Sequence, residues 1–225
     1  VERSRGLGDV YKRQQQRVAL ARSIAVQPRL LLLDEPFSDL DTNLKREIID
    51  DTLHLINSLD SSAIVVTHNA EEAMFLSDEI IVMEKGTIVQ TGKPHEIYFN
   101  PSNVYVASLF GEVNIFESKI QNSKCDTPLG TLETKNFKDN QLVNVVVRPE
   151  AIKLNVEKSP VTSPNSGVVV DSKFLGNNAI IHMTVKDSNN NKHHIHSKLI
   201  GDFLPDPASS VSYSLDHNHI FIFPR

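Results

Sequence analysis

The sequence predicts an α/β fold in its first half and an all-β fold in its second half. Up to about residue 111, short apolar runs alternate with helical patterns; from residue 112 on, short alternating strands are separated by turn residues. The length of 225 residues also suits two modest domains. We therefore expect a domain boundary near Gly111, where the helical patterns stop.

The first half is expected to form βαβ units of a mostly parallel sheet. Leu30–Leu33 is a purely aliphatic run, which predicts a buried strand. Thr42 can cap the helix that follows, in which apolar residues recur at three- and four-residue spacing. Ala63–Thr67 is the next β-branched run, Asn69 can cap a short helix, and Glu79–Glu84 predicts a further strand.

The second half has the pattern of an all-β domain. Its predicted strands are Leu142–Arg148, Val168–Phe174, Ala179–Lys186, His193–Ile200 and His219–Phe223. Six of the nine histidines follow residue 181, and His194 and His196 would share one face of a strand, a spacing that can give two ligands to a metal. Because no cysteine or carboxylate completes a ligand set, the favoured interpretation is that these are solvated strand residues.

The composition excludes several classes of protein. Leu30–Leu33, the longest aliphatic run, is far shorter than the about 20 apolar residues of a membrane-spanning helix, and the N-terminus lacks the apolar stretch of a secretory signal. The single Cys125 cannot form an internal disulfide, so a reducing, cytoplasmic setting is expected. The net charge is −5 and neither half is basic, which argues against a nucleic-acid partner.

The strongest chemical signal is the pair of carboxylates Asp34 and Glu35, which directly follows the first apolar strand. Ligands of open parallel sheets bind at the carboxyl ends of the strands. There, one carboxylate can hold Mg²⁺ while its neighbour positions or deprotonates water next to a phosphoryl group. The alternative interpretation is an acidic turn after a core strand.

Three further segments accompany this pair. His68 follows the next apolar strand, so its imidazole could contact the same phosphate. The helical pattern from Gln14 to Ala25 could direct its positive N-terminal end at a phosphate, although it also fits a solvent-facing amphipathic helix. The segment Ser38-Asp-Leu-Asp41 is by itself only a turn with a helix start.

Taken in order, these segments resemble the second half of an ABC-transporter ATPase. The similarity covers about residues 14–111 and is carried by five motifs: Gln14-Gln-Gln-Arg-Val-Ala-Leu-Ala-Arg22, Leu31-Leu-Leu-Asp-Glu-Pro-Phe-Ser38, Asp39-Leu-Asp41, Val65-Val-Thr-His68 and Glu71-Glu-Ala-Met74.

The resemblance implies a role for each matching residue. Asp34 corresponds to the Walker B carboxylate near Mg²⁺, Glu35 to the catalytic base and His68 to the switch histidine that reaches the γ-phosphate of ATP. Asp41 corresponds to the D-loop aspartate at the interface of an ATPase dimer, and Gln14 is the one residue that fits the end of the signature sequence that contacts ATP. The implied cofactors are therefore ATP and Mg²⁺.

The second half refines the resemblance. Gly92–Tyr98, Pro101–Asn103 and Gly111–Asn114 resemble the run that leads into an OB-like regulatory domain, and Val147–Glu150 and Phe174–Gly176 resemble landmarks of that domain. Such domains occur in importers of polyamines, ferric iron, sulfate or molybdate, and sugars. The expected fold is thus the C-terminal part of a P-loop ABC ATPase domain (14–111) followed by an all-β OB-like barrel domain (112–225).

The implied function is that of the ATP-binding subunit of an ABC importer, which couples ATP hydrolysis to solute transport. The implied partners are membrane permease subunits, a second ATPase subunit in a homodimer and, indirectly, a periplasmic or surface solute-binding protein, with no nucleic acid. The implied location is peripheral, on the cytoplasmic face of the cell membrane.

The sequence departs from the family's pattern before Gln14. The phosphate-binding loop Gly-x-x-x-x-Gly-Lys-Ser/Thr and the Gln loop are absent from the 225 residues, and Val10-Tyr-Lys-Arg13 stands where the signature has Leu-Ser-Gly-Gly. We therefore expect residues 1–13 to be a non-native leader and this chain by itself to bind ATP poorly. An alternative function is a non-hydrolysing regulatory or binding module in which only the second domain is active. Residues 1–111 alone are expected to aggregate, because their sheet would expose apolar faces at 30–33 and 64–66.

Overall fold

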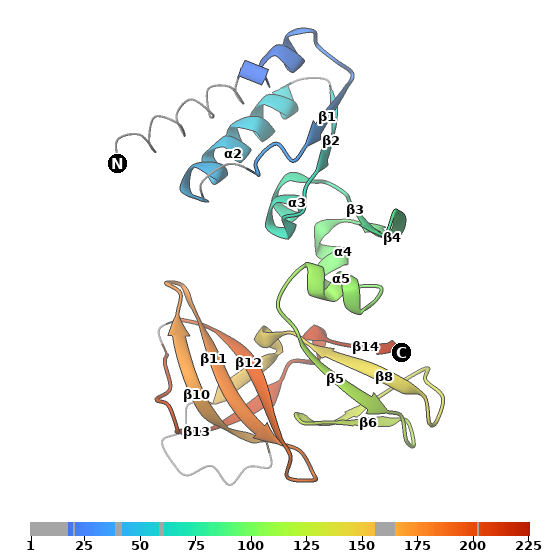
Figure 1. The fold of residues 1–225 in the computed structure, drawn as a ribbon, viewed down its shortest axis with the longest axis vertical. Coiled ribbons are helices and arrows are strands. Elements are labelled where there is room, and N and C mark those ends of the chain that lie inside the picture. Colours follow the sequence, from blue (N-terminus) through green and yellow to red (C-terminus); the bar gives the residue numbers. More distant parts are fainter. Residues whose placement is uncertain (1–17, 20, 39–41, 59–60, 156–164, 202) are drawn as a thin grey trace. The chain divides into compact units, whose positions relative to one another are not determined.

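The computed structural model describes the chain except for residues 1–17, 20, 39–41, 59–60, 156–164 and 202, and for the side chains of residues 42–44. The chain divides into two compact units, Val1–Ile80 and Ile81–Arg225 (Figure 1). The domain boundary that the sequence predicts near Gly111 is a different one from the division between these compact units. It concerns where an ATPase domain would end and a regulatory domain begin, and it stays a prediction.

A βαβ element organises the first unit, as the sequence predicts. Strands β1 (Leu30–Asp34) and β2 (Ser62–Val66) pair in parallel, with Leu32 opposite Ile64 and Asp34 opposite Val66. The helix α2 (Thr42–Ser58) forms the crossover between them, and α3 (Ala70–Leu76) follows β2. This connection brings the carboxyl ends of β1 and β2 to the same edge of the sheet.

The core of the first unit lies on one side of the β1–β2 pair. Phe37, Ile48 and Ile49 are buried together, and Leu76 of α3 packs against them. On the strands the expected burial of the whole apolar run is wrong, since Leu31 is buried whereas Leu32 is 68% exposed. The separate expectation that this sheet exposes apolar side chains is confirmed for the residues that alternate with the more buried ones. Besides Leu32, these are Leu30, Ile64 and Val66, which are also exposed.

The second unit begins with a small hairpin and two short helices. Strands β3 (Ile80–Glu84) and β4 (Thr87–Gly92) pair across the turn at Lys85 and Gly86, which both have positive φ. Helix α4 (Pro94–Phe99) and helix α5 (Val104–Leu109) follow. The side chain of Asn103 caps α5 by accepting a hydrogen bond from the amide of Val106 at 2.9 Å.

Among the residues that the structure describes after α5, all elements are strands or 3₁₀ turns, which confirms the all-β prediction for this part of the chain. They are β5 (Asn114–Lys119), β6 (Lys124–Thr127), β7 (Gly130–Glu133), β8 (Leu142–Val147), η1 (Pro149–Ala151), β9 (Ile152–Asn155), β10 (Ser166–Phe174), β11 (Asn178–Lys186), β12 (Lys192–Ile200), β13 (Ser210–Leu215), η2 (His217–His219) and β14 (Ile220–Pro224).

These strands form open sheets. The five-stranded sheet has the order β12-β11-β10-β13-β9, the three-stranded sheet β14-β8-β5, and β6 pairs with β7 (Figure 1). A closed barrel is not found among the described residues, which corrects that detail of the expected OB-like barrel. The reason is that β12 and β9 end the larger sheet without pairing to each other as strands.

The five-stranded and three-stranded sheets are held together by side-chain contacts rather than by strand pairing. One apolar core contains buried residues from both large sheets, among them Val145, Ile181 and Ile195. In addition, Asn114 of β5 donates to the carbonyl of His196 at 2.9 Å and accepts from its amide at 2.9 Å. Asn114 thereby satisfies polar backbone groups at the edge strand β12.

A buried arginine connects the two short helices to the three-stranded sheet. Arg148, 0% exposed, follows β8 and donates to the carbonyl of Tyr98 at 3.0 Å and to that of Ala107 at 3.3 Å. Its guanidinium carbon lies 3.8 Å from the centre of the Tyr98 ring, within range of a cation–π interaction. Burial lowers the pKa of Arg148, and burial together with a hydrogen bond to Glu150 raises the pKa of Tyr98 to about 12.

Candidate functional site

The candidate site lies where β1 and β2 end in the first unit. Asp34 is the last residue of β1, and the amide of Glu35 donates to the carbonyl of Val66, the last residue of β2, at 2.9 Å. His68 follows two residues later. Two segments that lie over 30 residues apart in the chain are thus held together at one sheet edge, where ligands of parallel sheets bind.

Glu35 and His68 face each other across this edge. The distance from His68 Nδ1 to Glu35 Oε1 is 3.3 Å, and the two side chains are 72% and 49% exposed, respectively. A hydrogen bond from Nδ1 to the carboxylate orients the imidazole and leaves Nε2 for a second partner. The pair is therefore positioned by its strands while it stays accessible to a ligand from solvent.

The backbone at Glu35 adopts a conformation that few non-glycine residues accept. Its φ is +44°, in the left-handed region, which costs an L-residue roughly 1–2 kcal/mol. Its polar backbone groups are all engaged: the amide binds Val66, and the carbonyl accepts from the amide and the hydroxyl of Ser38 at 3.3 and 3.1 Å. Strain that is fixed in this way is typical of functional sites.

The turn that carries His68 is fixed by side chains of its neighbours. The Asn69 side chain caps α3 by accepting hydrogen bonds from the amides of Glu71 and Glu72 at 2.9 and 3.2 Å. The hydroxyl of Thr67 donates to Glu72 at 2.6 Å and accepts from the amide of Asn69 at 3.1 Å. His68 therefore sits between two residues whose side chains are both hydrogen-bonded to fixed groups.

The sequence analysis did not predict that Glu72, which binds the Thr67 hydroxyl, would be a buried carboxylate. Glu72 is 5% exposed and forms an ion pair with Lys45 of α2, in addition to its hydrogen bond from Thr67. A buried carboxylate is stable only when it is paired in this way. The sequence gives one signal for it, the acidic first turn of α3, but nothing that identifies Lys45 as the partner.

The oxygen donors at the site fit a magnesium ion. Asp34 is exposed, and its carboxylate makes no hydrogen bond or ion pair with the described residues. Mg²⁺ prefers carboxylate oxygens and is usually held by one or two of them together with phosphate oxygens. Asp34 and the neighbouring Glu35 match that chemistry. The other two predicted site residues, Gln14 and Asp41, lie outside the described part of the chain.

Helices of membrane-spanning length and apolarity do not occur in the described part of the chain.

Comparisons with known proteins give one consistent family of relatives. The spermidine/putrescine import ATP-binding protein PotA of Mannheimia succiniciproducens is 34% identical over 213 residues, 90% of this chain and 56% of that protein. PotA of Clostridium acetobutylicum is 38% identical over 204 residues, 86% of this chain and 56% of that protein. The Fe(3+) ions import ATP-binding protein FbpC 1 of Haemophilus influenzae is 41% identical over 151 residues, 65% of this chain and 46% of that protein.

The chain spans about half the length of the curated relatives it matches. The longest of these alignments covers both the α/β part and the all-β part, since it includes 90% of this chain. No protein-family model matches the chain.

Proposed function

Because this chain is homologous to the ATP-binding subunits of ABC importers, we propose that it forms the C-terminal part of a subunit that hydrolyses ATP to drive solute import. The observation that carries the proposal is the Glu35–His68 pair, 3.3 Å apart at the carboxyl ends of adjacent parallel strands. The carboxylate of Glu35 can act as the base for the attacking water, and the imidazole of His68 can donate a hydrogen bond to the phosphate that the water attacks.

The proposed mechanism assigns one task to each side chain. Glu35 orients a water molecule and accepts its proton during attack on the γ-phosphate, a role for which its exposed carboxylate is accessible. His68, with both ring nitrogens protonated, donates from Nε2 to a γ-phosphate oxygen and from Nδ1 to Glu35. Asp34 would hold Mg²⁺, which when bound neutralises charge on the phosphate oxygens.

The proposed assembly extends beyond this chain. Asp41 and Gln14 would act at the interface with a second copy of the subunit, where each bound ATP is enclosed between two copies. The pair of subunits would lie on the cytoplasmic face of the membrane under two permease subunits, and closure around ATP would change the side to which the permease opens. A solute-binding protein would deliver the transported solute from the opposite side.

The test compares two exposed histidines in the protein encoded by the complete reading frame that contains this chain. We expect His68→Ala to lower kcat for Mg-ATP by about 100-fold or more, the usual effect of removing one donor to the developing charge. His54→Ala is the matched control, because His54 is 81% exposed on α2 and lies outside the site. Equal rates for His68→Ala and wild type, or no hydrolysis by the wild-type protein with Mg²⁺, would contradict the proposal.

A further inference from the structure

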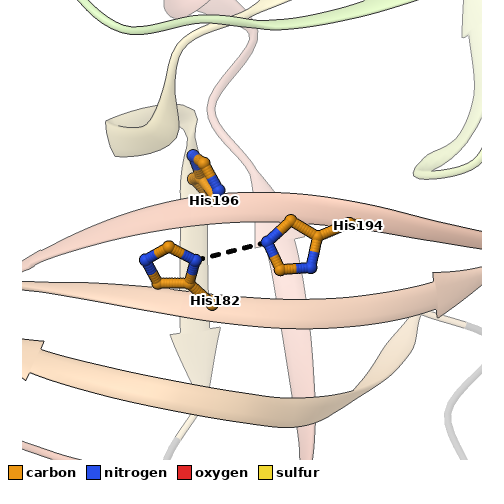
Figure 2. A group of neighbouring side chains, drawn as sticks. All are labelled: His182, His194 and His196. Carbon is orange, nitrogen blue, oxygen red and sulfur yellow. Dashed lines mark hydrogen bonds between the residues drawn. The ribbon is translucent and has the colours of Figure 1, made fainter.

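Three histidines of the second unit converge on one face of the five-stranded sheet. His182 lies on β11, and His194 and His196 lie on the neighbouring edge strand β12 (Figure 2). One ring nitrogen from each residue can be chosen so that all three atoms lie within 4.8 Å of one another. The sequence suggested only the pair His194 and His196 and offered no third ligand.

Strand register explains why the third histidine joins the pair. In the antiparallel ladder His182 is directly opposite His196, while His194 precedes His196 by two residues on the same face. The residues that alternate with them, Ile195 and Ser197, point to the other face and are buried. The three imidazoles are therefore the polar, solvent-accessible side of a sheet whose opposite side belongs to the core.

The side chain of Asn114 helps to hold His196 close to His182. Its side chain binds both the amide and the carbonyl of His196, at 2.9 Å each. Those two backbone groups therefore point away from β11, which makes His182 and His196 a non-hydrogen-bonded pair of the antiparallel ladder. Side chains of such pairs lie closer together than those of hydrogen-bonded pairs.

The spacing of the ring nitrogens suits a zinc ion. The dashed line in Figure 2 joins His182 Nδ1 and His194 Nε2, and these two atoms lie 3.2 Å apart. Zn²⁺ binds imidazole nitrogen at about 2.0–2.1 Å with tetrahedral geometry, which places two ligand nitrogens about 3.3–3.4 Å apart. The ring of His196 completes the triangle, with its centre 4.4 Å from that of His182 and 5.1 Å from that of His194.

The chemistry of the donors selects the class of metal. Three imidazoles suit zinc, copper or nickel, whereas Mg²⁺ and Ca²⁺ require oxygen ligands. Asp171 lies opposite His182 on the other neighbouring strand, but its carboxylate is paired with Lys173 at 2.7 Å. Among the described residues the ligand set is thus three histidines, which leaves the fourth tetrahedral position to water or to a group from another molecule.

We propose that His182, His194 and His196 form a binding site for a divalent transition metal of the zinc type. The site stands on β11 and β12 alone, so it is independent of ATP chemistry at the first unit. The competing explanation for the short His182–His194 distance is a hydrogen bond between the two rings in the absence of metal. Metal binding separates these explanations, because two rings joined only by a hydrogen bond would not bind zinc.

The experiment measures Zn²⁺ binding to the full 225-residue chain by competition with a chromophoric chelator and by the thermal melt. Wild type should bind one equivalent, and its melting temperature should rise by about 5–10 °C at a free Zn²⁺ concentration 100 times the Kd. His194→Gln, at the most exposed of the three positions, should weaken binding by more than about 100-fold, since loss of an outer-shell partner alone costs 10–100-fold.

Two controls make the result specific. His217→Gln alters an exposed histidine of the same unit outside the cluster and should bind zinc like the wild type. Mg²⁺ should leave the melting temperature of the wild type unchanged. X-ray absorption of the zinc-loaded chain should show nitrogen ligands at about 2.0–2.1 Å with the scattering of imidazole rings. Equal zinc affinity of wild type and His194→Gln, or no binding by the wild type, would overturn the proposal.

Discussion

Removal of the buried Arg148 is expected to destabilise the second unit strongly. Arg148→Ala deletes two hydrogen bonds from a charged donor, each of about 1.5–3 kcal/mol, and a desolvated cation–π contact of about 2 kcal/mol. The gross loss of about 5–8 kcal/mol is reduced because the variant no longer buries a charge. We expect a net loss of about 3–5 kcal/mol, since the carbonyls of Tyr98 and Ala107 remain unpaired.

Urea unfolding followed by circular dichroism measures this loss, with a parallel thermal melt. For a unit of this size the predicted destabilisation lowers the melting temperature by about 10 °C. Arg225→Ala is the matched control, because Arg225 forms an exposed ion pair with Glu117 at 2.6 Å and should cost less than about 1 kcal/mol. If Arg148→Ala and Arg225→Ala unfold at the same urea concentration, the assignment of Arg148 as the connection between the helices and the sheet is wrong.

Three further predictions concern other contacts. Glu72→Ala should destabilise the first unit by about 2–4 kcal/mol, because a buried, doubly bound carboxylate is lost, whereas Glu71→Ala should change stability by less than about 1 kcal/mol in the same urea titration. Gly167→Ala should lower the melting temperature, since an added Cβ would lie 2.4 Å from the Met183 side chain and 3.1 Å from a backbone oxygen; an unchanged melt would show that the strand yields freely. Tyr98 has a folded-state pKa of about 12 against an ordinary value of 10.0. The protonated phenol therefore contributes to the free energy of unfolding below pH 10, and this contribution is lost as the pH rises towards 12. In Tyr98→Phe the fall in stability between pH 10 and 12 should be smaller, and an identical fall in both proteins would refute the pKa shift.

Local patterns were sufficient to predict much of the first unit. The apolar runs at β1 and β2 and the intervening helical period predict a βαβ element, and parallel pairing then brings Glu35 and His68 to one edge. The cap at Asn69 was also predictable, because an Asx residue before an acidic turn is a common helix start. The prediction succeeded here because each signal and its consequence lie within one connection.

Contacts between distant segments could not be predicted in the same way. His182 joins His196 only because the register of β11 and β12 places them opposite each other, and no local pattern encodes that register. The sequence around Arg148 indicates only a basic residue at the end of a strand. Its burial depends on two helices that lie about 40–50 residues earlier in the chain. The open sheets, too, follow from which strands pair, which is a property of the whole unit rather than of any strand.

The most direct test of the proposed function separates ATP binding from ATP hydrolysis at Glu35. In the protein encoded by the complete reading frame, Glu35→Gln removes the base but keeps the shape of the side chain, and Glu47→Gln on the exposed face of α2 is the control. Binding of a fluorescent ATP analogue and single-turnover hydrolysis of Mg-ATP are measured for both variants. We predict that Glu35→Gln binds the analogue within about threefold of wild type but hydrolyses ATP about 100-fold or more slowly, as for loss of a general base. Hydrolysis by Glu35→Gln at the rate of Glu47→Gln would contradict the assignment of Glu35 as the catalytic base.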